Sequence, residues 1–336
     1  MDFCLRWDLN WKKKMNDYSK KILSNYYELK HKVKDEYEKQ KKEEESIVLV
    51  GTATCGIASG ALEVVKAIKE EIDKSGIKAN VIQVGCLGHC YAEPLVIIKK
   101  AGFPSICYNQ INPVTAKALV KRFIIEEDPC LEFVLGALEE NELIPPVSLL
   151  PRFSGEKRYI LKHCGLINPE DINEYIISDG YKAMAMALEK IPEEIINEIK
   201  ESGLRGRGGA GFPTGKKLEF CFNTKTKPKY VICNADEGDP GAFMDRAILE
   251  SCPHQVIEGM IICGYAVGAE FGYIYVRQEY PLAIERIKIA LKQAESMGFI
   301  GNNIFGSGFN FNLKVFKGSG AFVCGEETAL ISSLEG

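Results

Sequence analysis

The run Ser202-Gly-Leu-Arg-Gly206-Arg-Gly-Gly-Ala-Gly211-Phe-Pro-Thr-Gly-Lys-Lys217 concentrates glycine, arginine and lysine in one short stretch. Glycine loses more conformational entropy on ordering than any other residue, so glycines at this density indicate a function. Without Cβ atoms, the backbone N–H groups can approach a ligand closely, and the neighbouring basic side chains favour an anion such as a phosphate. Phe212 offers a flat apolar face on which a ring can stack.

Two well-known phosphate loops do not fit this run. Gly206, Gly208 and Gly211 match G-x-G-x-x-G, but that pattern requires a strand before it, and the preceding Pro192–Glu201 has the apolar spacing of a helix. The Walker pattern fails because Ala210 occupies the first glycine position and Lys217 replaces the Ser or Thr, which argues against a kinase or NTPase. A flexible linker is the alternative, but linkers seldom mix Arg, Phe, Pro and Lys so densely. The run therefore predicts a nucleotide or flavin phosphate loop of another kind.

Composition limits the class of protein. The chain has 336 residues, 46% of them hydrophobic, which predicts two or three domains with real cores. A net charge of −4 argues against nucleic acid as a partner. We expect no membrane span and no signal peptide, because no apolar stretch is long enough. The 12 cysteines are scattered through apolar runs, which predicts a reducing, cytoplasmic compartment and a few metal ligands.

Four segments are expected. Residues 1–46 form a charged helical segment with an apolar stripe, and it is either a solvated helix or a partner-docking arm. Residues 47–126 form a small α/β domain, 127–160 a proline-punctuated linker, and 161–336 a second α/β domain, so the fold class is α/β. In the first domain, the order strand–helix–strand, then hairpin and helix, is that of a thioredoxin-like fold. Its predicted elements are strand 47–50, helix 61–75, strand 79–85, the hairpin 95–98 and 105–108, and helix 116–123.

Cysteines follow both parallel strands of this first domain. Cys55 lies in the loop after the first strand, and Cys86-x3-Cys90 in the loop after the second. Thiolates on neighbouring strand-end loops can converge on one iron–sulfur cluster. The alternative is that they are ordinary buried core residues, which we expect of Cys107 and Cys130. His89 inside this loop could be a ligand, but it is expected at the surface.

This unit resembles the thioredoxin-like [2Fe–2S] ferredoxin domain through Cys86, Cys90 and Pro94. That family has a second cysteine near the first strand, where this chain has Leu49, Val50 and Gly51. A cluster normally needs four protein ligands. Either another group completes the set, with Thr52, Thr54 or a distant cysteine as candidates, or the domain holds no iron.

Two further blocks carry polar residues at predicted element ends. The strand Lys229–Asn234 runs into Asn234-Ala-Asp-Glu-Gly-Asp-Pro-Gly241, at the kind of strand end where α/β sheets bind ligands. The alternative is that its acidic residues cap the helix at 242–249. In Gly318–Leu330 a glycine turn is expected to lead into a strand, after which Glu326 and Glu327 open a helix; capping alone could account for these glutamates as well.

Taken together, the blocks 203–215, 234–241 and 318–328 resemble the NADH-binding flavoprotein subunit of respiratory complex I. The fused ferredoxin-like domain makes the chain more similar to the versions in NAD(P)-linked hydrogenases and formate dehydrogenases. The resemblance covers residues 47–336. It implies a Rossmann-like α/β domain that binds FMN and NADH, an NADH dehydrogenase (diaphorase) activity, a [2Fe–2S] cluster in the first domain, and iron–sulfur subunits of a multi-subunit redox complex as partners.

The resemblance also implies roles for individual residues. Phe212 would stack on the dinucleotide, and Asp239 would lie near NADH. One lysine of the Lys216–Lys217 pair, with Lys217 preferred, would contact FMN. Phe322 stands where complex I members often have Tyr. No residue is a catalytic acid or base, because the flavin performs the chemistry. The loop residues implied to embrace NAD and FMN are Gly206, Arg207, Gly208, Gly209, Ala210, Gly211, Phe212, Thr214 and Gly215; those implied to hold FMN or line the site are Asn234, Asp236, Glu237, Gly325, Glu326 and Glu327.

Family members continue beyond the position of Gly336 into more FMN-contacting sequence, a ubiquitin-like domain and a [4Fe–4S] domain. We therefore expect the FMN domain to be incomplete in this sequence. The alternative function is a non-catalytic scaffold or docking subunit of such a complex.

Overall fold

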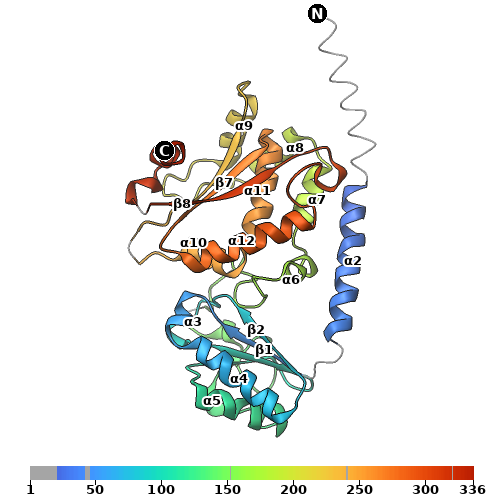
Figure 1. Cartoon of the computed structure of the whole chain (residues 1–336), viewed down its shortest axis with the longest axis vertical. Coiled ribbons are helices and arrows are strands. Elements are labelled where there is room, and N and C mark those ends of the chain that lie inside the picture. The colour runs from blue at the N-terminus through green and yellow to red at the C-terminus, as the bar shows by residue number, and fades with distance from the viewer. Residues whose placement is uncertain (1–20, 42–45, 152, 240, 320) are drawn as a thin grey trace, which may run out of the picture. The chain divides into compact units, whose positions relative to one another are not determined.

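The computed structural model describes residues 21–41, 46–151, 153–239, 241–319 and 321–336 (Figure 1). Its contacts divide the chain into two units. The five-stranded unit comprises Glu36–Pro169 and Ala247–Cys252, and the three-stranded unit comprises Glu170–Arg246, Pro253–Gly336 and the described part of Met1–Asp35. The expected helical segment 1–46 lies partly outside the described residues. No helix within them combines the length and apolar character needed to cross a bilayer.

The five-stranded unit has the strand order β2-β1-β3-β4-β5. β1 and β2 are parallel, and β3, β4 and β5 continue the sheet with antiparallel pairs. The βαβ–ββα order expected of a thioredoxin-like fold is therefore confirmed. The elements are β1 (Ser46–Gly51), α3 (Thr54–Ala58), α4 (Ala61–Ser75), β2 (Ala79–Val84), β3 (Val96–Lys100), β4 (Ile106–Tyr108) and α5 (Pro113–Leu119), which a π-helical turn (Val120–Ile125) follows.

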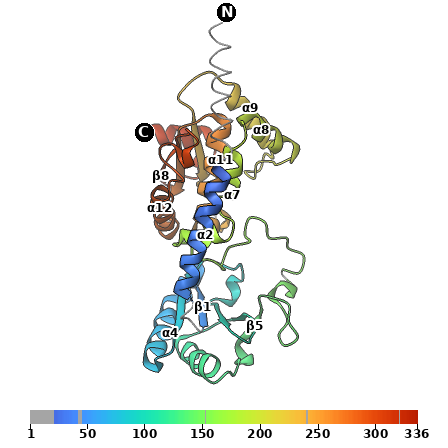
Figure 2. The same ribbon diagram turned by 90° about the vertical axis from the view of Figure 1, so that its right-hand side faces the viewer.

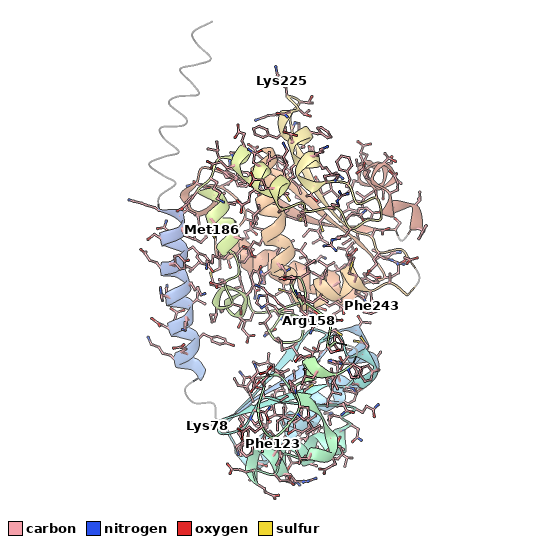
Figure 3. All side chains as sticks on the ribbon, turned by 180° about the vertical axis from the view of Figure 1, so that it is seen from behind. Lys78, Phe123, Arg158, Met186, Lys225 and Phe243 are labelled. Atoms are coloured by element: carbon pink, nitrogen blue, oxygen red, sulfur yellow. The ribbon has the colours of Figure 1, made fainter. Side chains whose placement is uncertain are left out.

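Both faces of this sheet are covered, which is why its strands read as continuous apolar runs. Successive strand residues point to opposite faces. Val48 and Val50 belong to one core cluster, which also holds residues of α4 and Phe123 (Figure 3). Leu49 belongs to a second cluster with Ile97. Burying large side chains on both faces contributes roughly 25 cal/mol for each Å² of apolar surface removed from water.

The expected linker 127–160 differs from the structure in its first half. β5 (Val134–Ala137) pairs antiparallel with β4 and forms an edge of the sheet. Residues as far as Pro169 belong to the five-stranded unit. The four residues of β5 are too few to show the alternation of apolar and polar residues that predicts a strand. The strand forms because the edge of β4 is free to pair with it.

The three-stranded unit is a parallel sheet in the order β6-β7-β8, with α11 in contact with α7, α8, α9, α12 and two of the strands. Because the strands are parallel, their carboxyl ends meet at one edge, where α/β sheets bind ligands. The strands are β6 (Tyr230–Ala235), β7 (Phe271–Arg277) and β8 (Asn312–Gly318); the helices are α6 (Ile172–Ile177), α7 (Lys182–Leu188), α8 (Pro192–Glu201), α9 (Thr214–Asn223), α10 (Met244–Ser251), α11 (Pro253–Val267), α12 (Pro281–Ser296) and α13 (Glu327–Glu335).

The N-terminal helix α2 (Ile22–Lys41) lies beside α7 (Figure 2). The predicted apolar stripe is its buried face, with Tyr26 fully buried. The Tyr26 hydroxyl donates to Gly180 O at 2.9 Å, and Lys30 Nζ lies 2.6 Å from Asp179 Oδ1. The first part of α2 is thus an integral element of the three-stranded unit.

A buried polar chain links α7, α11 and α12. His254 Nδ1 lies 2.9 Å from the Tyr181 hydroxyl, and Nε2 lies 3.0 Å from Gln293 Oε1. The Gln293 amide nitrogen donates to Glu170 O, so its oxygen faces the ring. Nε2 is therefore the protonated nitrogen, and Nδ1 accepts from Tyr181. Burial lowers the pKa of His254 from 6.5 to about 4.

This histidine predicts an acid-dependent loss of stability. Between pH 6.5 and 4 the unfolded chain binds a proton that the folded chain does not, so the free energy of unfolding falls as the pH falls, by up to about 3 kcal/mol. Urea unfolding near pH 7 and near pH 4.5 should show wild type losing about 2 kcal/mol more than His254→Gln. If the free energy of unfolding changed equally with pH in wild type and His254→Gln, the lowered pKa of His254 would be contradicted.

Candidate functional site

The glycine run forms a narrow loop that projects from a pair of short extended segments. Gly206 N donates to Phe212 O at 2.9 Å, and Thr214 N donates to Leu204 O at 2.9 Å. Gly209 and Gly211 have φ values of +98° and +62°, a backbone conformation that only glycine adopts readily. No atom lies within 4 Å of a Cβ built on Gly208, Gly209 or Gly211, so the loop backbone is open to a ligand. Arg207 and Ala210 in the same loop are exposed.

Gly215 has a packing role instead. A Cβ there would lie 2.6 Å from Lys200 Cγ and 2.7 Å from Lys200 N, so only glycine lets α9 approach α8 this closely. Thr214 begins α9, and Phe212, just before it, is 47% exposed. The order helix, glycine loop, helix confirms that this is not the strand–loop–helix context of a dinucleotide fingerprint.

Asp236 is the least satisfied polar residue of this region. It lies just beyond β6 and is 6% exposed, yet neither carboxylate oxygen has a hydrogen-bond partner. Burial raises the pKa of Asp236, while Arg277 opposes the shift. A buried carboxylate without hydrogen bonds is costly and needs an explanation, and a ligand that donates to it is one.

Its neighbour Glu237 has a different role. Glu237 Oε1 accepts from Asp245 N at 3.0 Å and Oε2 from Arg246 N at 3.2 Å, which satisfies the first N–H groups of α10. Tyr280 also donates to Glu237 Oε2. For Glu237 the capping alternative therefore accounts for both carboxylate oxygens. Asp239, by contrast, is exposed.

The second and third blocks meet at Gly325. Asn234 Nδ2 donates to Gly325 O at 2.9 Å, and Asn234 Oδ1 accepts from Asp236 N. A Cβ on Gly238 would lie 3.3 Å from Phe322 Cα. The expected strand after Gly320 is wrong, because Phe322–Gly325 is a 3₁₀ turn that exposes 70% of Phe322. β8 ends at Gly318, and no strand of the described residues pairs with the segment that follows it.

The first and third blocks meet through an ion pair. Lys217 Nζ lies 3.0 Å from Glu327 Oε2, and both side chains are about 70% exposed. Glu326 caps α13, accepting from Thr328 N at 3.0 Å and Ala329 N at 3.1 Å. The hydrogen bond from the Thr328 hydroxyl lowers the pKa of Glu326. The three blocks therefore converge on residues 325–327 at the carboxyl edge of the sheet.

These residues fit a flavin mononucleotide. Its ribityl hydroxyls are donors that can satisfy Asp236, and its phosphate is an anion suited to the open glycine loop and Lys217. The exposed ring of Phe212 offers a face for stacking. The unpartnered oxygens of Asp236 are the observation on which this fit depends.

A separate cluster of thiols lies in the five-stranded unit. The ligand atoms of Cys55, Cys86 and Cys90 all lie within 4.8 Å of one another. Cys86 Sγ is 3.7 Å from Cys55 Sγ and 3.6 Å from Cys90 Sγ, and it accepts a hydrogen bond from Gly88 N. The predicted convergence of two strand-end loops is confirmed. Hydrogen bonds with the other two thiols and burial raise the pKa of Cys86, so metal binding must displace protons.

The hydroxyls of two candidates for the fourth ligand have partners of their own. The Thr52 hydroxyl donates to Val84 O, and the Thr54 hydroxyl donates to Glu250 Oε1. His89 is buried rather than at the surface, with its ring centroid 4.0 Å from that of Phe153.

Glu93 is a residue that the sequence reasoning missed. It is 7% exposed, and its Oε1 lies 3.9 Å from Cys55 Sγ. Burial raises the pKa of Glu93 to about 7. The sequence feature that could have indicated Glu93 is its position, three residues after Cys90 and directly before Pro94. A single glutamate at that place has no recognisable ligand spacing.

Two further thiols of the five-stranded unit are core residues. Cys107 and Cys130 are fully buried, as predicted. None of the cysteines in the described residues forms a disulfide. Arg158 (Figure 3) donates to Leu87 O at 2.7 Å, within the loop that carries Cys86 and Cys90.

Comparison with known proteins assigns the larger part of the three-stranded unit. Residues 199–336 match the family model described as the Nuo51 FMN-binding domain. Over 179 residues the chain is 55% identical to "NADP-reducing hydrogenase subunit HndC" of Solidesulfovibrio fructosivorans, covering 53% of this chain and 36% of the relative. Over 189 residues it is 50% identical to an NADH-quinone oxidoreductase subunit of Aquifex aeolicus, covering 56% of this chain and 44% of the relative.

A solved NAD+-reducing [NiFe]-hydrogenase aligns with 87% of this chain and 46% of that chain, at 24% identity and a TM-score of 0.42. The chain thus spans less than half the length of the curated relatives it matches. The predicted resemblance to FMN-binding flavoprotein subunits is confirmed for residues 199–336. All the glycine-loop, strand-end and Gly318–Thr328 residues lie inside that segment.

Proposed function

We propose that this chain binds FMN and NADH in the three-stranded unit and oxidises NADH as a component of a multi-subunit redox complex in the cytoplasm. The observation that carries the proposal is the buried, unpartnered carboxylate of Asp236 at the point where the three blocks meet. The proposal is also supported by similar proteins: the match to the FMN-binding family model, and relatives named as hydrogenase and NADH-quinone oxidoreductase subunits.

Each block has a physical role in this proposal. Backbone N–H groups of the open loop 207–211, with Lys217, attract the phosphates. Asp236 accepts from ribityl hydroxyls, and Asn234 holds the turn at Gly325 in position. Phe212 stacks against a ring of the dinucleotide, and Glu326 and Glu327 border the site. Bound FMN would supply the hydride-accepting chemistry and the release of single electrons.

The metal site is proposed as the place through which electrons leave. Thiolates are the ligands that iron–sulfur clusters prefer, and Cys55, Cys86 and Cys90 are close enough to share one centre. We propose a [2Fe–2S] cluster there, as a separate feature of the five-stranded unit.

An anaerobic spectroscopic titration tests the proposed function. Adding FMN to the purified chain should quench flavin fluorescence to saturation, and NADH should then bleach the visible flavin band. A chain that leaves FMN fluorescence unchanged contradicts the flavin assignment. A chain that binds FMN but shows no bleaching by NADH supports instead the scaffold alternative.

Lys217 provides a sharper prediction at this site. Its ion pair with Glu327 is solvent-exposed, so Lys217→Gln should change the free energy of unfolding by less than about 0.5 kcal/mol. The same variant should weaken FMN binding about fivefold and reduce its dependence on salt, because one charge facing the phosphate is lost. Lys216→Gln, an exposed lysine beside it, is the matched control. Equal effects of the two variants on FMN affinity would contradict a specific role for Lys217.

A further inference from the structure

The three-cysteine cluster lacks a fourth thiol. Within the part of the chain that the structure describes, the group of close ligand atoms contains Cys55, Cys86 and Cys90 only. Tetrahedral metal centres with thiolate ligands, and [2Fe–2S] clusters, take four protein ligands unless solvent or substrate fills a position. The question is which neighbouring donor is placed to complete the set.

Glu93 places a carboxylate oxygen beside Cys55. Its Oε1 lies 3.9 Å from Cys55 Sγ, while its Oε2 accepts from Leu95 N at 2.8 Å. One oxygen therefore anchors the side chain to the start of β3, and the other faces the thiols. The hydroxyls of Thr52 and Thr54 are engaged with Val84 O and Glu250, as described above.

The surrounding backbone leaves room for this carboxylate. A Cβ on Gly51 would lie 3.1 Å from Glu93 Oε2 and 3.2 Å from Oε1, and a Cβ on Gly56 would lie 3.2 Å from Oε2. Gly51 stands at the end of β1, in the segment where a second cysteine was expected. The space near the first strand is thus filled by a carboxylate oxygen that comes from the other cysteine loop.

The charge of Glu93 has no basic counterpart in the described residues. Its hydrogen-bond partners in the described residues are Cys55 Sγ and Leu95 N. A carboxylate that is 93% buried without a cation is unfavourable, and a bound metal ion would compensate it. Glu93 also lines a cavity of about 350 Å³ together with Ser59 and Pro94.

We infer that Glu93 is the fourth protein ligand of a metal centre held by Cys55, Cys86 and Cys90. The inference concerns the same thiols as the proposed [2Fe–2S] cluster but does not depend on the identity of the metal. Three thiolates and one carboxylate suit iron or zinc. Binding replaces the three thiol protons, and the carboxylate proton where Glu93 carries one, by the metal.

The test compares wild type with Glu93→Gln and a matched control. Glutamine keeps an oxygen that can accept from Leu95 N but removes the anionic ligand. The control is Glu71→Gln, because Glu71 is 4% exposed in the same unit and pairs with Lys121 rather than with the thiols. The full chain is purified without oxygen and loaded either with Co²⁺ alone or with ferric iron and sulfide.

Glu93→Gln should bind Co²⁺ about tenfold more weakly than wild type, whereas Glu71→Gln should match wild type. The Co²⁺ absorption spectrum should also change in Glu93→Gln at saturating metal, which loss of a merely structural side chain would not cause. Glu93→Asp, which keeps the charge but withdraws the oxygen, should show an intermediate affinity and an altered spectrum. It replaces Glu93→Gln if that variant does not fold.

The outcomes distinguish the ligand role of Glu93 from the proposed [2Fe–2S] cluster. Wild-type affinity and an unchanged Co²⁺ spectrum in Glu93→Gln overturn the inference, as does a wild-type chain that does not bind Co²⁺. If Co²⁺ binding depends on Glu93 but wild type retains no iron and sulfide, the ligand assignment stands and the proposed [2Fe–2S] cluster fails.

Discussion

Replacing Asp236 by Asn should weaken FMN binding about 10- to 100-fold and at the same time stabilise the FMN-free chain. A hydrogen bond to a charged group contributes about 1.5–3 kcal/mol, and both Asp236 oxygens await donors. In the free protein the same buried charge is unfavourable, since burial raises the pKa of Asp236. Removing it should raise the free energy of unfolding by about 1 kcal/mol.

Two measurements check this result. Fluorescence quenching gives the FMN dissociation constant of wild type and Asp236→Asn, and thermal unfolding without FMN gives their relative stability. Wild-type affinity in the variant would contradict the ligand role of Asp236. A lower melting temperature would show that its carboxylate is satisfied in the free protein.

Glu237 is the informative neighbour for comparison. Glu237→Ala removes the cap of α10 and should lower the free energy of unfolding by about 1 kcal/mol, opposite in sign to Asp236→Asn. If the adjacent variants changed stability in the same direction, a general disturbance of the strand-end turn would explain both.

Replacing Cys86 by Ser should abolish metal binding in the five-stranded unit. Cys86 Sγ is the central atom of the cluster, within 3.7 Å of both other thiols, and it accepts the Gly88 N–H. A hydroxyl is a poor ligand for iron or zinc compared with a thiolate, and the variant leaves two cysteines. We expect metal retained after desalting to fall at least about tenfold.

The control for this variant is Cys130→Ser. Cys130 is fully buried in the same unit, and its Sγ lies 3.4 Å from Asp128 O, which a serine hydroxyl can also reach. Metal analysis after anaerobic loading should find wild-type content in Cys130→Ser. If Cys86→Ser retained as much metal as Cys130→Ser, the cluster would not be the metal site.

The sequence predicted elements with strong periodicity almost to the residue. Helix 61–75 has the expected bounds, because a repeating apolar face determines it. β5 could not be predicted, since its pairing depends on an edge strand far from it in sequence. The turn Phe322–Gly325 was misread for the opposite reason: its apolar residues suggest a strand, but no partner lies beside it.

The motifs predicted which segments form the candidate site, but they did not predict the role of each residue within it. Asp236 and Glu237 are adjacent acids, and only the direction of each side chain makes one an unpartnered acceptor and the other a helix cap. Gly215 belongs to the glycine run but serves the contact with α8. Glu93 gave no spacing signal, because its proximity to Cys55 arises from two strand-end loops that meet only in the folded unit.

Amide hydrogen exchange with and without FMN tests the central claim most directly, that the three blocks form one flavin site. Saturating FMN should slow exchange together in the loop 206–217, the turn 234–239 and the segment 321–329, with no comparable change in the five-stranded unit. Protection confined to a single block, or to residues outside all three, would contradict the assignment.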